Sequence, residues 1–558
     1  MHTNYKGRVT LKFYTNSNGY TLLIAVCALL IFSVIGLSLV SVTANGLKKN
    51  ESREFNVLAT DLADKGISYA VSDFQFQLEN LIKNPIGKTT FGTELDKLLG
   101  YNSTTEQLTS TSNKYHCGPT TLHGLKIDSS KAENYTNVCI QNVEMIKTNG
   151  QIEEKDRYKR LVTLKSTGVV DGKIKETFSK VIIGTDAIPD QLKYAVSTNE
   201  GGNLFLHGGI EIKGDIKTAG NLILTNKASW GTASDPNSDN RWTDSLYPKI
   251  IKNDTSVTPK IIMQEEGKNI YNLKFNNTTL KSSFYKNNHI KGTSLSNTSY
   301  YDKLSFNENV LSNYLFNSND VMLVKRKLND DQVDIDNEFN NISSNAIRHD
   351  SLTNGLTNTD KNKVYHIAKY KKPNCNKNCN TSGSITIDNK SSARLVGKYY
   401  VDGDVEITDS NLYADAILYV KGNVKIDGST VLGTNTNSTL FIFAKGDITF
   451  SNIYQKTSGD KQYDLKGFYY SQSNMHILGV KSHMKITGGV SGKDIILTGV
   501  RGIGKNNDFD SVNAQRTKEA RLKIIYDENL IKQFHEFKRD EEEEFIKSIN
   551  DPEILERY

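Results

Sequence analysis

The side chains with the most varied chemistry in this chain are its five cysteines. Cys27 lies within an apolar run, Cys117 and Cys139 form one sequence-local pair, and Cys375 and Cys379 form another. A bridge between Cys117 and Cys139 would close a loop of about 20 residues, worth about 3 kcal/mol in the chain-entropy model. Disulfides and free thiols both stay open for the two pairs.

A metal site is the third interpretation of these cysteines. It would need His116, His123 or His366 as additional ligands. The spacing of the cysteines and histidines matches no known zinc pattern. We therefore expect no metal ion and no cofactor.

A second set of reactive side chains lies beside recurring glycines in the C-terminal half. The set consists of Asp402, Asp404, Asp447 and Asp494, with Arg501 nearby. Clustered carboxylates, alone or with a basic residue, are the groups that cleave polysaccharides. Aspartate also favours turns, which explains these positions without catalysis. Since no phosphate loop, nucleophile elbow or metal motif accompanies them, we predict that the chain is not an enzyme.

The composition says little about partners. The net charge of +6 is spread over 69 basic and 63 acidic residues. We find no dense basic patch of the kind that nucleic acid requires, so no nucleic-acid site is expected.

The element that positions everything else is an apolar stretch near the N-terminus. No charged residue lies between Lys12 and Lys48, and the run from Leu22 to Val40 is long enough to cross a bilayer as a helix. Apolar residues then recur at intervals of three and four, so the helix is predicted to continue amphipathically to about Lys83. The recurring positions include Leu58, Leu62, Ala63, Ile67, Ala70 and Val71.

Three interpretations of this N-terminus compete. An ordinary secretory signal would be cut after Ala44, and a plain signal anchor would keep Met1. Alternatively, a basic cytoplasmic leader ends at Gly19, and cleavage there would leave the helix attached with Tyr20 as the new N-terminus. A lipoprotein signal at Cys27 fails, because Val26 before it is too large and most of the apolar run follows it.

The third interpretation carries a family resemblance. The sequence Gly19-Tyr20-Thr21-Leu22-Leu23, after a charged leader and before an apolar helix, resembles type IV prepilins and their pseudopilin relatives. The resemblance implies cleavage by a prepilin peptidase after Gly19, N-methylation of Tyr20, and packing of the helix against other pilin-like subunits in a filament.

One residue departs from the family pattern. Major subunits carry a glutamate at the fifth residue after the cleavage site, where this chain has Ile24. In the family this acid is thought to pair with the N-terminal amine of a neighbouring subunit, and Ile24 removes one half of that pair. The departure favours a minor or tip subunit, similar to PilX-like minor pilins, over a shaft subunit.

The exported part is predicted to be mainly β. Two strands joined at Asp171-Gly172 predict a hairpin, as in a pilin head. Short strand–glycine–strand units then recur around Gly403, Gly422 and Gly446, where we expect the backbone to turn through positive φ. Stacked units of this size predict a parallel β-helix, with a β-sandwich of hairpins as the alternative.

The expected fold class is therefore α+β and mainly β, with a long N-terminal helix, a hairpin head and a solenoid. The predicted divisions are a leader at 1–19, a transmembrane helix at 20–43, an amphipathic extension at 44–83, a pilin-like head with the hairpin at 84–190, β-helix-like repeats at 200–230 and 391–505, an Asn/Ser-rich inserted region at 231–390, and a C-terminal strand and charged helix at 506–558.

These observations predict a minor or tip subunit of a pilus-like or secretion-type filament at the cell membrane, with its C-terminal part exported and its head serving assembly or adhesion. The alternative is a membrane-anchored β-helix that binds a surface glycan or, less in keeping with its turns, cleaves one.

Overall fold

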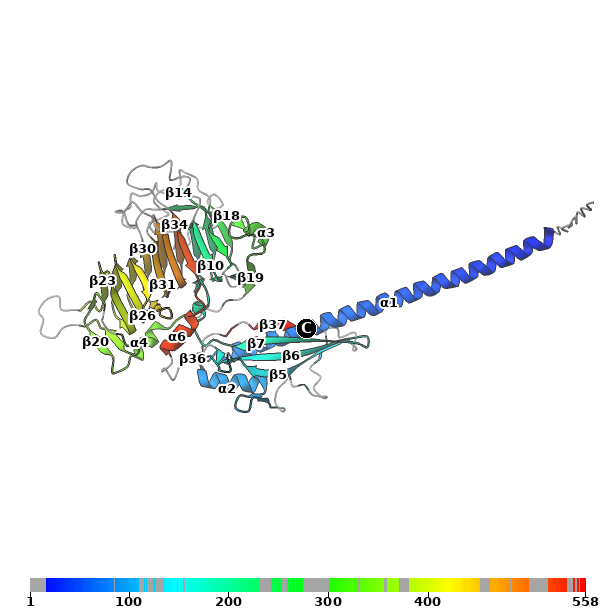
Figure 1. Ribbon diagram of the computed structural model, residues 1–558, viewed down its shortest axis with the longest axis horizontal. Coiled ribbons are helices and arrows are strands. Elements are labelled where there is room, and N and C mark those ends of the chain that lie inside the picture. Colours follow the sequence, from blue (N-terminus) through cyan, green and yellow to red (C-terminus); the bar gives the residue numbers. More distant parts are fainter. Residues whose placement is uncertain are drawn as a thin grey trace, which may run out of the picture.

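A computed structural model gives the fold of the chain (Figure 1). It describes residues 17–84, 86–109, 115, 117, 124–126, 134–147, 149–153, 156–229, 242–252, 258–265, 267–273, 301–326, 328, 332–355, 359–370, 381–451, 462–480, 483–500, 520–538, 545–546, 549–550 and 552–558. The fold is α+β and mainly β, as expected, with one long N-terminal helix and large sheets.

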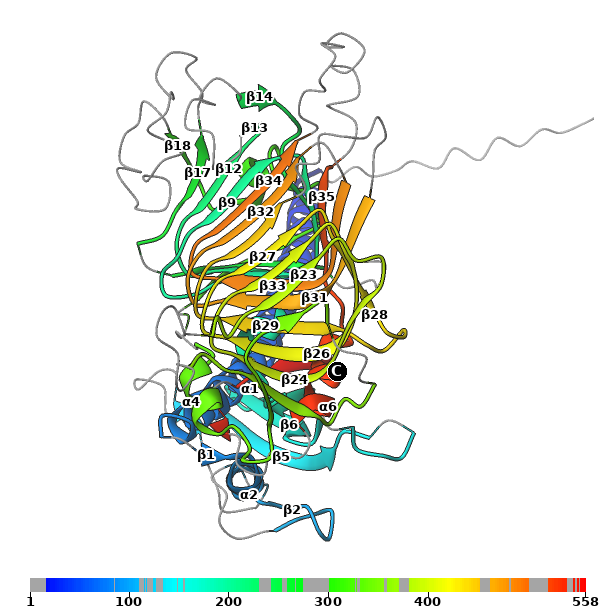
Figure 2. The same cartoon turned by 90° about the vertical axis from the view of Figure 1, so that its left-hand side faces the viewer.

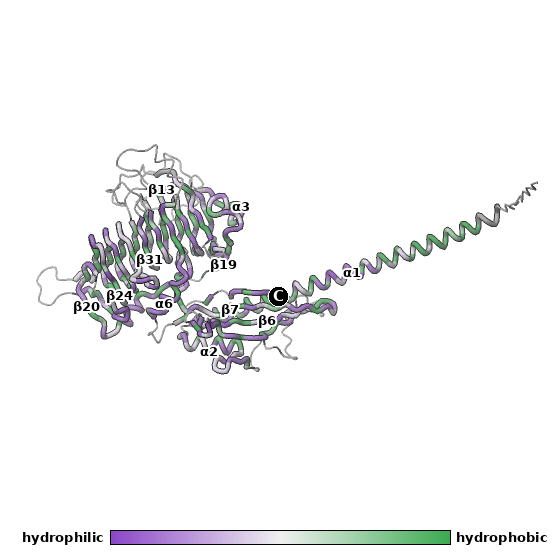
Figure 3. The backbone as a smooth tube through the Cα atoms, viewed as in Figure 1, coloured by the Kyte–Doolittle hydropathy of each residue, from purple (hydrophilic) through white to green (hydrophobic). Residues whose placement is uncertain are grey.

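Helix α1 (Ser17–Leu81) is continuous over 65 residues, which corresponds to a length of about 100 Å. Its N-terminal part extends away from the rest of the molecule, and its C-terminal part lies across a sheet (Figures 1 and 3). The buried side chains of α1 recur every three or four residues: Ala59, Ala63, Ile67, Ala70, Phe74 and Leu78. This spacing places them on one face of the helix, which therefore packs on the sheet.

The sheet under α1 has five antiparallel strands in the order β37-β7-β6-β5-β4. The strands are β4 (Gly124–Lys126), β5 (Tyr135–Met145), β6 (Lys159–Val170), β7 (Lys173–Gly184) and β37 (Glu553–Arg557). Asp171 and Gly172, with φ of 46° and 74°, form the two-residue turn between β6 and β7. Positive φ at both positions is what a two-residue hairpin favours.

We call α1 from Ala59 onward and this sheet, together with helix α2 (Lys88–Leu99), the head. A close approach holds its two layers together. A Cβ atom at Gly66 would overlap Ser166 Oγ, and one at Gly168 would overlap the Ala59 carbonyl oxygen. Glycine at both positions therefore lets the helix and the sheet approach more closely than other residues would allow.

The chain leaves the head after β7 and returns to it as β37, which pairs with β7. Everything between residues 195 and 526 is thus an insertion into the head sheet. The C-terminal segment predicted as strand and charged helix has two destinations. Helix α6 (Leu530–Lys538) packs outside the inserted part, and β37 completes the head sheet.

The inserted part, which we call the parallel region, consists chiefly of two large sheets (Figure 2). The 15-stranded sheet contains β8 (Val196–Thr198), β10 (Ile210–Lys213), β11 (Ile216–Thr218), β15 (Lys249–Ile251), β16 (Lys260–Gln264), β19 (Met322–Arg326), β20 (Ile347–His349), β22 (Val364–Ile367), β24 (Ala393–Val401), β26 (Asn411–Val420), β28 (Thr430–Gly433), β29 (Leu440–Ala444), β31 (Gln462–Ser471), β33 (His483–Gly492) and β35 (Leu522–Ile525). All pairings within it are parallel.

The 11-stranded sheet contains β9 (Leu204–Gly208), β12 (Leu222–Thr225), β17 (Ile270–Leu273), β18 (Tyr301–Leu304), β21 (Leu352–Thr353), β23 (Ile385–Asp388), β25 (Val405–Thr408), β27 (Val424–Asp427), β30 (Ile448–Ser451), β32 (Met475–Val480) and β34 (Ile495–Val500). Its strands pair in parallel, apart from the antiparallel pair of β17 with the outermost strand β18. From β22 to β34 the chain passes repeatedly from one sheet to the other.

The strand order shows that β8, the first strand of the parallel region, lies in the middle of the 15-stranded sheet. From β8 the chain proceeds through β11 and β16 to β19 at one end, and it resumes with β20 at the opposite end. It then runs back through β22, β24, β26 and β31 until β33 pairs with β8. Along the sheet, the strands of residues 347–492 are thus followed by those of residues 196–326, the reverse of their order in the sequence, and the two groups meet at the junction of β33 with β8.

The interior follows the same order without a break at the junction. One column of aligned, buried residues in the 11-stranded sheet runs Ile385, Val405, Val424, Ile448, Met475, Ile495, Leu204, Leu222 and Ile270. Residues from both parts of the sequence thus share one apolar core. Fully burying each such side chain contributes about 1.5–3 kcal/mol.

The expected inserted region at 231–390 needs correction. Strands β15, β16 and β17 and strands β20, β22 and β23 fall within it and extend the same two sheets. These strands have only three to five residues. Strands this short between polar stretches show too little alternation to be recognised in sequence.

The role expected of the repeated glycines also needs correction. Gly403, Gly422 and Gly446 are absent from the residues with positive φ. They stack on one another instead: the Gly422 amide donates to the Gly403 carbonyl at 3.1 Å, and the Gly446 amide donates to the Gly422 carbonyl at 3.1 Å. A Cβ atom at Gly422 would overlap Asp404 Oδ1, so close stacking requires the glycine.

Candidate functional site

The exposed apolar part of α1 is the first candidate. It is the one helix among the described residues that is long and apolar enough to cross a membrane. Leu22, Leu23 and Ile24 are 70%, 61% and 53% exposed, and the exposure of large apolar side chains continues to Leu47. Figure 3 shows this apolar part projecting from the molecule. Contiguous apolar surface of this extent marks contact with a membrane or another protein.

The residues predicted for processing lie within this helix. Gly19, Tyr20 and Thr21 belong to α1, which begins at Ser17, two residues before the predicted end of the leader. Residues 1–16 of that leader lie outside the described part of the chain. Cys27 is an exposed free cysteine on the same helix.

A second apolar stripe follows α1 over the head. Leu58, Tyr69 and Phe76 are 43%, 41% and 59% exposed. At 100° per residue they project from the side of the helix that faces away from the sheet. The helix therefore presents apolar side chains both at its free end and along its outer side.

The cysteine pair near the head is bridged. Cys117 and Cys139 form a disulfide with their Cα atoms 5.0 Å apart. Cys139 is in β5, so the bridge ties the segment before β4 to the middle of the head sheet. Cys375 and Cys379 lie outside the described residues, as do His116 and His123. Among the described residues no group of His, Cys, Asp and Glu side chains is arranged to hold a metal ion.

The structure places Asp404, Asp447 and Asp494 in a ladder of side chains along the turns of the parallel region. Asp404 Oδ1 accepts the Asn423 amide at 2.7 Å, and Asn423 Oδ1 accepts the Asp447 amide at 2.9 Å. Asp447 Oδ1 accepts the Asn474 amide at 3.0 Å. The ladder also crosses the junction of the stack, where Asp494 Oδ1 accepts the Asn203 amide at 2.6 Å. Each carboxylate thus satisfies a backbone donor of the next turn.

Asp402 lies outside this ladder and is tied to three other groups. It accepts from the Lys369 amide at 2.9 Å and from Lys421 Nζ at 3.0 Å, and it lies 3.2 Å from His366 Nε2. Burial alone would raise the pKa of Asp402, but these donors outweigh it and hold the pKa below its ordinary value. Arg501, the predicted basic partner, lies outside the described residues.

The connection between the head and the parallel region contains a buried charge cluster that sequence reasoning missed. Asp190, in the short 3₁₀ helix Asp190–Lys193, accepts from Lys217 Nζ at 2.6 Å, and both side chains are buried. Burial would raise the pKa of Asp190, but Lys217 and Lys193 outweigh it and lower the pKa. Lys193 also donates to Asn550 on the returning chain at 2.7 Å, so the outgoing and returning segments are joined.

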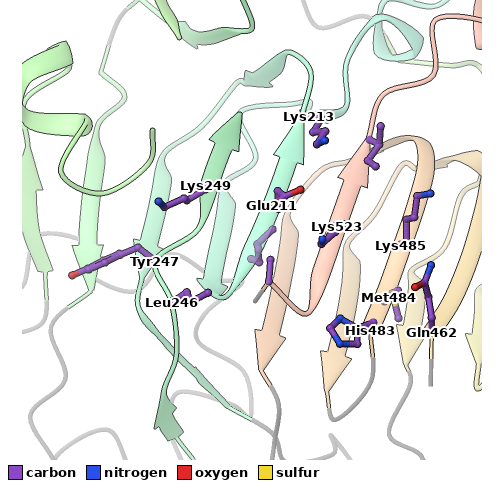
Figure 4. A pocket seen from close by; sticks show the side chains of 13 residues that line it. Glu211, Lys213, Leu246, Tyr247, Lys249, Gln462, His483, Met484, Lys485 and Lys523 are labelled. Atoms are coloured by element: carbon purple, nitrogen blue, oxygen red, sulfur yellow. The ribbon is translucent and has the colours of Figure 1, made fainter. Parts of the chain in front are cut away.

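A hollow lies on the outer face of the 15-stranded sheet. A groove of about 730 Å³ lies over strands β10, β15, β31, β33 and β35 (Figure 4). Its side chains include Lys213, Lys249, Lys485 and Lys523. In sequence these lysines alternate with buried apolar residues, as in Met484-Lys485-Ile486. That alternation signals outward-facing positions, but nothing local indicates that segments so far apart become neighbours.

Comparison with known proteins adds little to this geometry. No family model matches the chain, and no curated protein does. Among solved structures, the competence-associated pilin ComZ from Thermus thermophilus aligns over 90% of this chain and 97% of that chain, at 12% sequence identity and a TM-score of 0.25. Similarity at this TM-score carries no argument about fold or function.

Proposed function

We propose that this chain is a minor, pilin-like subunit of a surface filament or secretion-type assembly, anchored in the membrane by α1 before assembly. The proposal rests mainly on one uninterrupted helix whose two parts have different surroundings. Its N-terminal part is apolar and exposed, and its C-terminal part packs across an antiparallel sheet. The sequence Gly19-Tyr20-Thr21-Leu22-Leu23 at the start of that helix supports cleavage after Gly19.

The apolar surface of α1 would serve in two environments. In the membrane, the exposed run from Leu22 onward lies in hydrocarbon, where a helix satisfies its own backbone hydrogen bonds. On assembly, the same surface and the outer stripe at Leu58, Tyr69 and Phe76 would pack against helices of neighbouring subunits. The surface is buried in lipid before assembly and against neighbouring subunits after it. Extraction from the membrane therefore does not leave it exposed to water.

A minor or tip position is supported by Ile24 and by size. Ile24 leaves this chain without an acid at the fifth residue after Gly19, and the side chain is exposed on the helix. The parallel region is far larger than the head that carries it, and it projects beside the head rather than along α1 (Figure 1). A bulky inserted part is easier to accommodate at a tip than at every position along a shaft.

We further propose that the two parallel sheets are the faces of one β-helical solenoid. Three observations support it: the passage of the chain between the sheets, the continuous apolar column, and the ladder of Asp and Asn side chains at the turns. In such a fold each unit contacts only its neighbours, so stability is shared along the stack.

We propose that the parallel region binds rather than cleaves. Asp404, Asp447 and Asp494 are engaged with backbone amides of neighbouring turns. A general acid or nucleophile must instead be aimed at substrate. The parallel region would then present a surface for adhesion, with the head and α1 providing attachment.

The proposal is tested by replacing Gly19 with phenylalanine in cells that carry a prepilin peptidase. We expect Gly19→Phe to stay in the membrane fraction with its leader attached and to be absent from sheared surface material. Gly36→Ala is the matched control, since a Cβ atom at Gly36 has nothing within 4 Å; it should be processed like the unchanged chain. Equal processing of both variants would contradict the proposal.

A further inference from the structure

The groove on the outer face of the 15-stranded sheet contains a row of charges that the strand register places side by side. In the strand register, Glu211 lies opposite Lys249 on one neighbouring strand and opposite Lys523 on the other, and Lys523 lies opposite Lys485. Neighbouring strands are about 4.8 Å apart. The row therefore reads Lys249, Glu211, Lys523, Lys485 across four strands, with Lys213 two residues beyond Glu211 on its strand (Figure 4).

These lysines differ from others on the same region. Lys425 forms an ion pair with Glu406 on the neighbouring strand at 2.8 Å. Lys421 forms one with Asp402 at 3.0 Å, and Lys445 forms one with Asp336 at 2.7 Å. Within the described part of the chain, no carboxylate lies within 4.0 Å of the amino groups of the four groove lysines: Lys213, Lys249, Lys485 and Lys523.

The position of Lys485 directly opposite Lys523 in the strand register is the most telling feature of the row. Like charges directly opposite each other on neighbouring strands destabilise a sheet. A hollow that concentrates positive charge at a cost in stability is suited to an anionic ligand.

We propose that this groove binds an acidic polysaccharide, whose carboxylates are held by Lys249 at one position and by Lys523 and Lys485 at the next. Lys249 and Lys523 are two strand spacings apart, about 10 Å, which is close to the length of a disaccharide, and Lys485 is one strand spacing farther. Glu211, between Lys249 and Lys523, and Gln462 at the end of the groove accept and donate hydrogen bonds to sugar hydroxyls.

The same geometry disfavours nucleic acid. A nucleic acid carries a phosphate at every nucleotide, and binding grows with the number of phosphates that basic residues neutralise. Here Glu211 interrupts the row, and Asp464 pairs with Lys485 on its other side. A polymer with charges farther apart places its uncharged parts against these carboxylates.

The test is binding of hyaluronate, which has one carboxylate per disaccharide, to the full chain in detergent micelles, measured by calorimetry at about 0.05 M and about 0.5 M salt. We expect binding at low salt that is strongly weakened at high salt. Lys523→Glu and Lys485→Glu should each weaken binding by about tenfold or more, because each reverses a charge at the contact. The uncharged change Lys523→Gln should weaken it less than Lys523→Glu.

Lys425→Glu is the matched control, since it makes the same charge change on the other sheet, where the lysine already has a carboxylate partner. It should leave binding unchanged, and circular dichroism should show that every variant is folded at the temperature of the binding measurement. The proposal is overturned by no measurable binding, by equal binding of neutral dextran, or by equal loss in Lys425→Glu. Tighter binding of single-stranded oligothymidylate, lost in the same lysine variants, would assign the groove to nucleic acid instead.

This inference does not depend on assembly, because the measurement is made on single chains in micelles. Failure of hyaluronate binding would leave the processing result with Gly19→Phe untouched. Failure of processing would likewise leave the groove measurement intact.

Discussion

The head and the parallel region bury their sheets in different ways. In the head, β5, β6 and β7 follow one another in sequence, pair antiparallel, and are covered on one face by α1. In the parallel region, sheet neighbours such as β33 and β8 come from distant parts of the chain, and the two sheets bury apolar residues between them. The head is therefore stabilised by strands close in sequence and by one long helix. The parallel region is stabilised by many repeated strand pairings and by the pairing of β33 with β8, which joins its two parts.

The largest effect is expected where the two regions join. Asp190→Ala leaves Lys217, whose side chain is 6% exposed, without its carboxylate. Removing one partner of a buried ion pair costs about 3–5 kcal/mol. Denaturant unfolding monitored by circular dichroism should show this loss.

Glu406→Ala is the comparison for that measurement, because it breaks an exposed pair with Lys425. An exposed pair contributes less than about 1 kcal/mol. Equal small effects from Asp190→Ala and Glu406→Ala would mean that the junction does not rely on its buried charge.

The next effect is a dependence of the parallel region on pH. His207, in β9 at the junction with β34, is buried, and this burial lowers its pKa from 6.5 to about 4. The unfolded chain then binds a proton at His207 at a higher pH than the folded chain. Stability should therefore be complete above pH 6.5 and fall as the pH drops towards about 4, by about 3 kcal/mol in total.

Unfolding free energies measured between pH 4 and pH 7 check this expectation. His207→Gln should flatten the dependence over that range, whatever its effect on stability at neutral pH. An unchanged slope in the variant would show that other groups cause it.

An effect of similar size but confined to the head is expected from its disulfide. Cys117→Ser with Cys139→Ser opens a loop with a sequence separation of 22. The chain-entropy model predicts a loss of about 3 kcal/mol. Protease resistance of the two regions, followed by peptide mass, should show earlier cleavage in the head and unchanged cleavage in the parallel region. Equal loss of protection in both regions would argue that they unfold as one unit.

The smallest effects are expected to differ in sign between the regions. Gly422→Ala places a Cβ atom against Asp404 Oδ1 and should destabilise the parallel region by about 1–3 kcal/mol. Gly92→Ala lies within α2, where a Cβ atom meets Tyr158 at an ordinary 3.5 Å. It should stabilise the head by about 0.5–1 kcal/mol. Melting temperatures of the two variants would move in opposite directions, and an unchanged or raised melting temperature of Gly422→Ala would contradict the stacking explanation of Gly422.

The sequence was a better guide to the head than to the parallel region, for a physical reason. The period of α1 and the turn at Asp171-Gly172 are local signals, since the contacts they predict lie within a few residues. The alternation around Gly403 and Gly422 also indicates strands, but the same alternation cannot say that β33 pairs with β8. That pairing depends on which end of the stack is open, which is a property of the whole chain.

The groove lysines show the same limit. Lys485 and Lys523 are recognisable as outward residues of strands, yet their position opposite each other depends on the pairing of β33 with β35, which local sequence does not indicate. Buried Asp190 and Lys217 gave no signal either, because both residue types are usually solvated and their pairing appears only in three dimensions.

The most direct test of the proposed function is mass spectrometry of the N-terminal peptide of the mature chain purified from cells. The proposal predicts a peptide that begins at Tyr20 and carries an added N-methyl group, with helix α1 otherwise intact. A peptide that begins at Asn45 would mean ordinary secretion without the apolar helix. A peptide that retains Met1 would mean a signal anchor, and either result would contradict a pilin-like subunit.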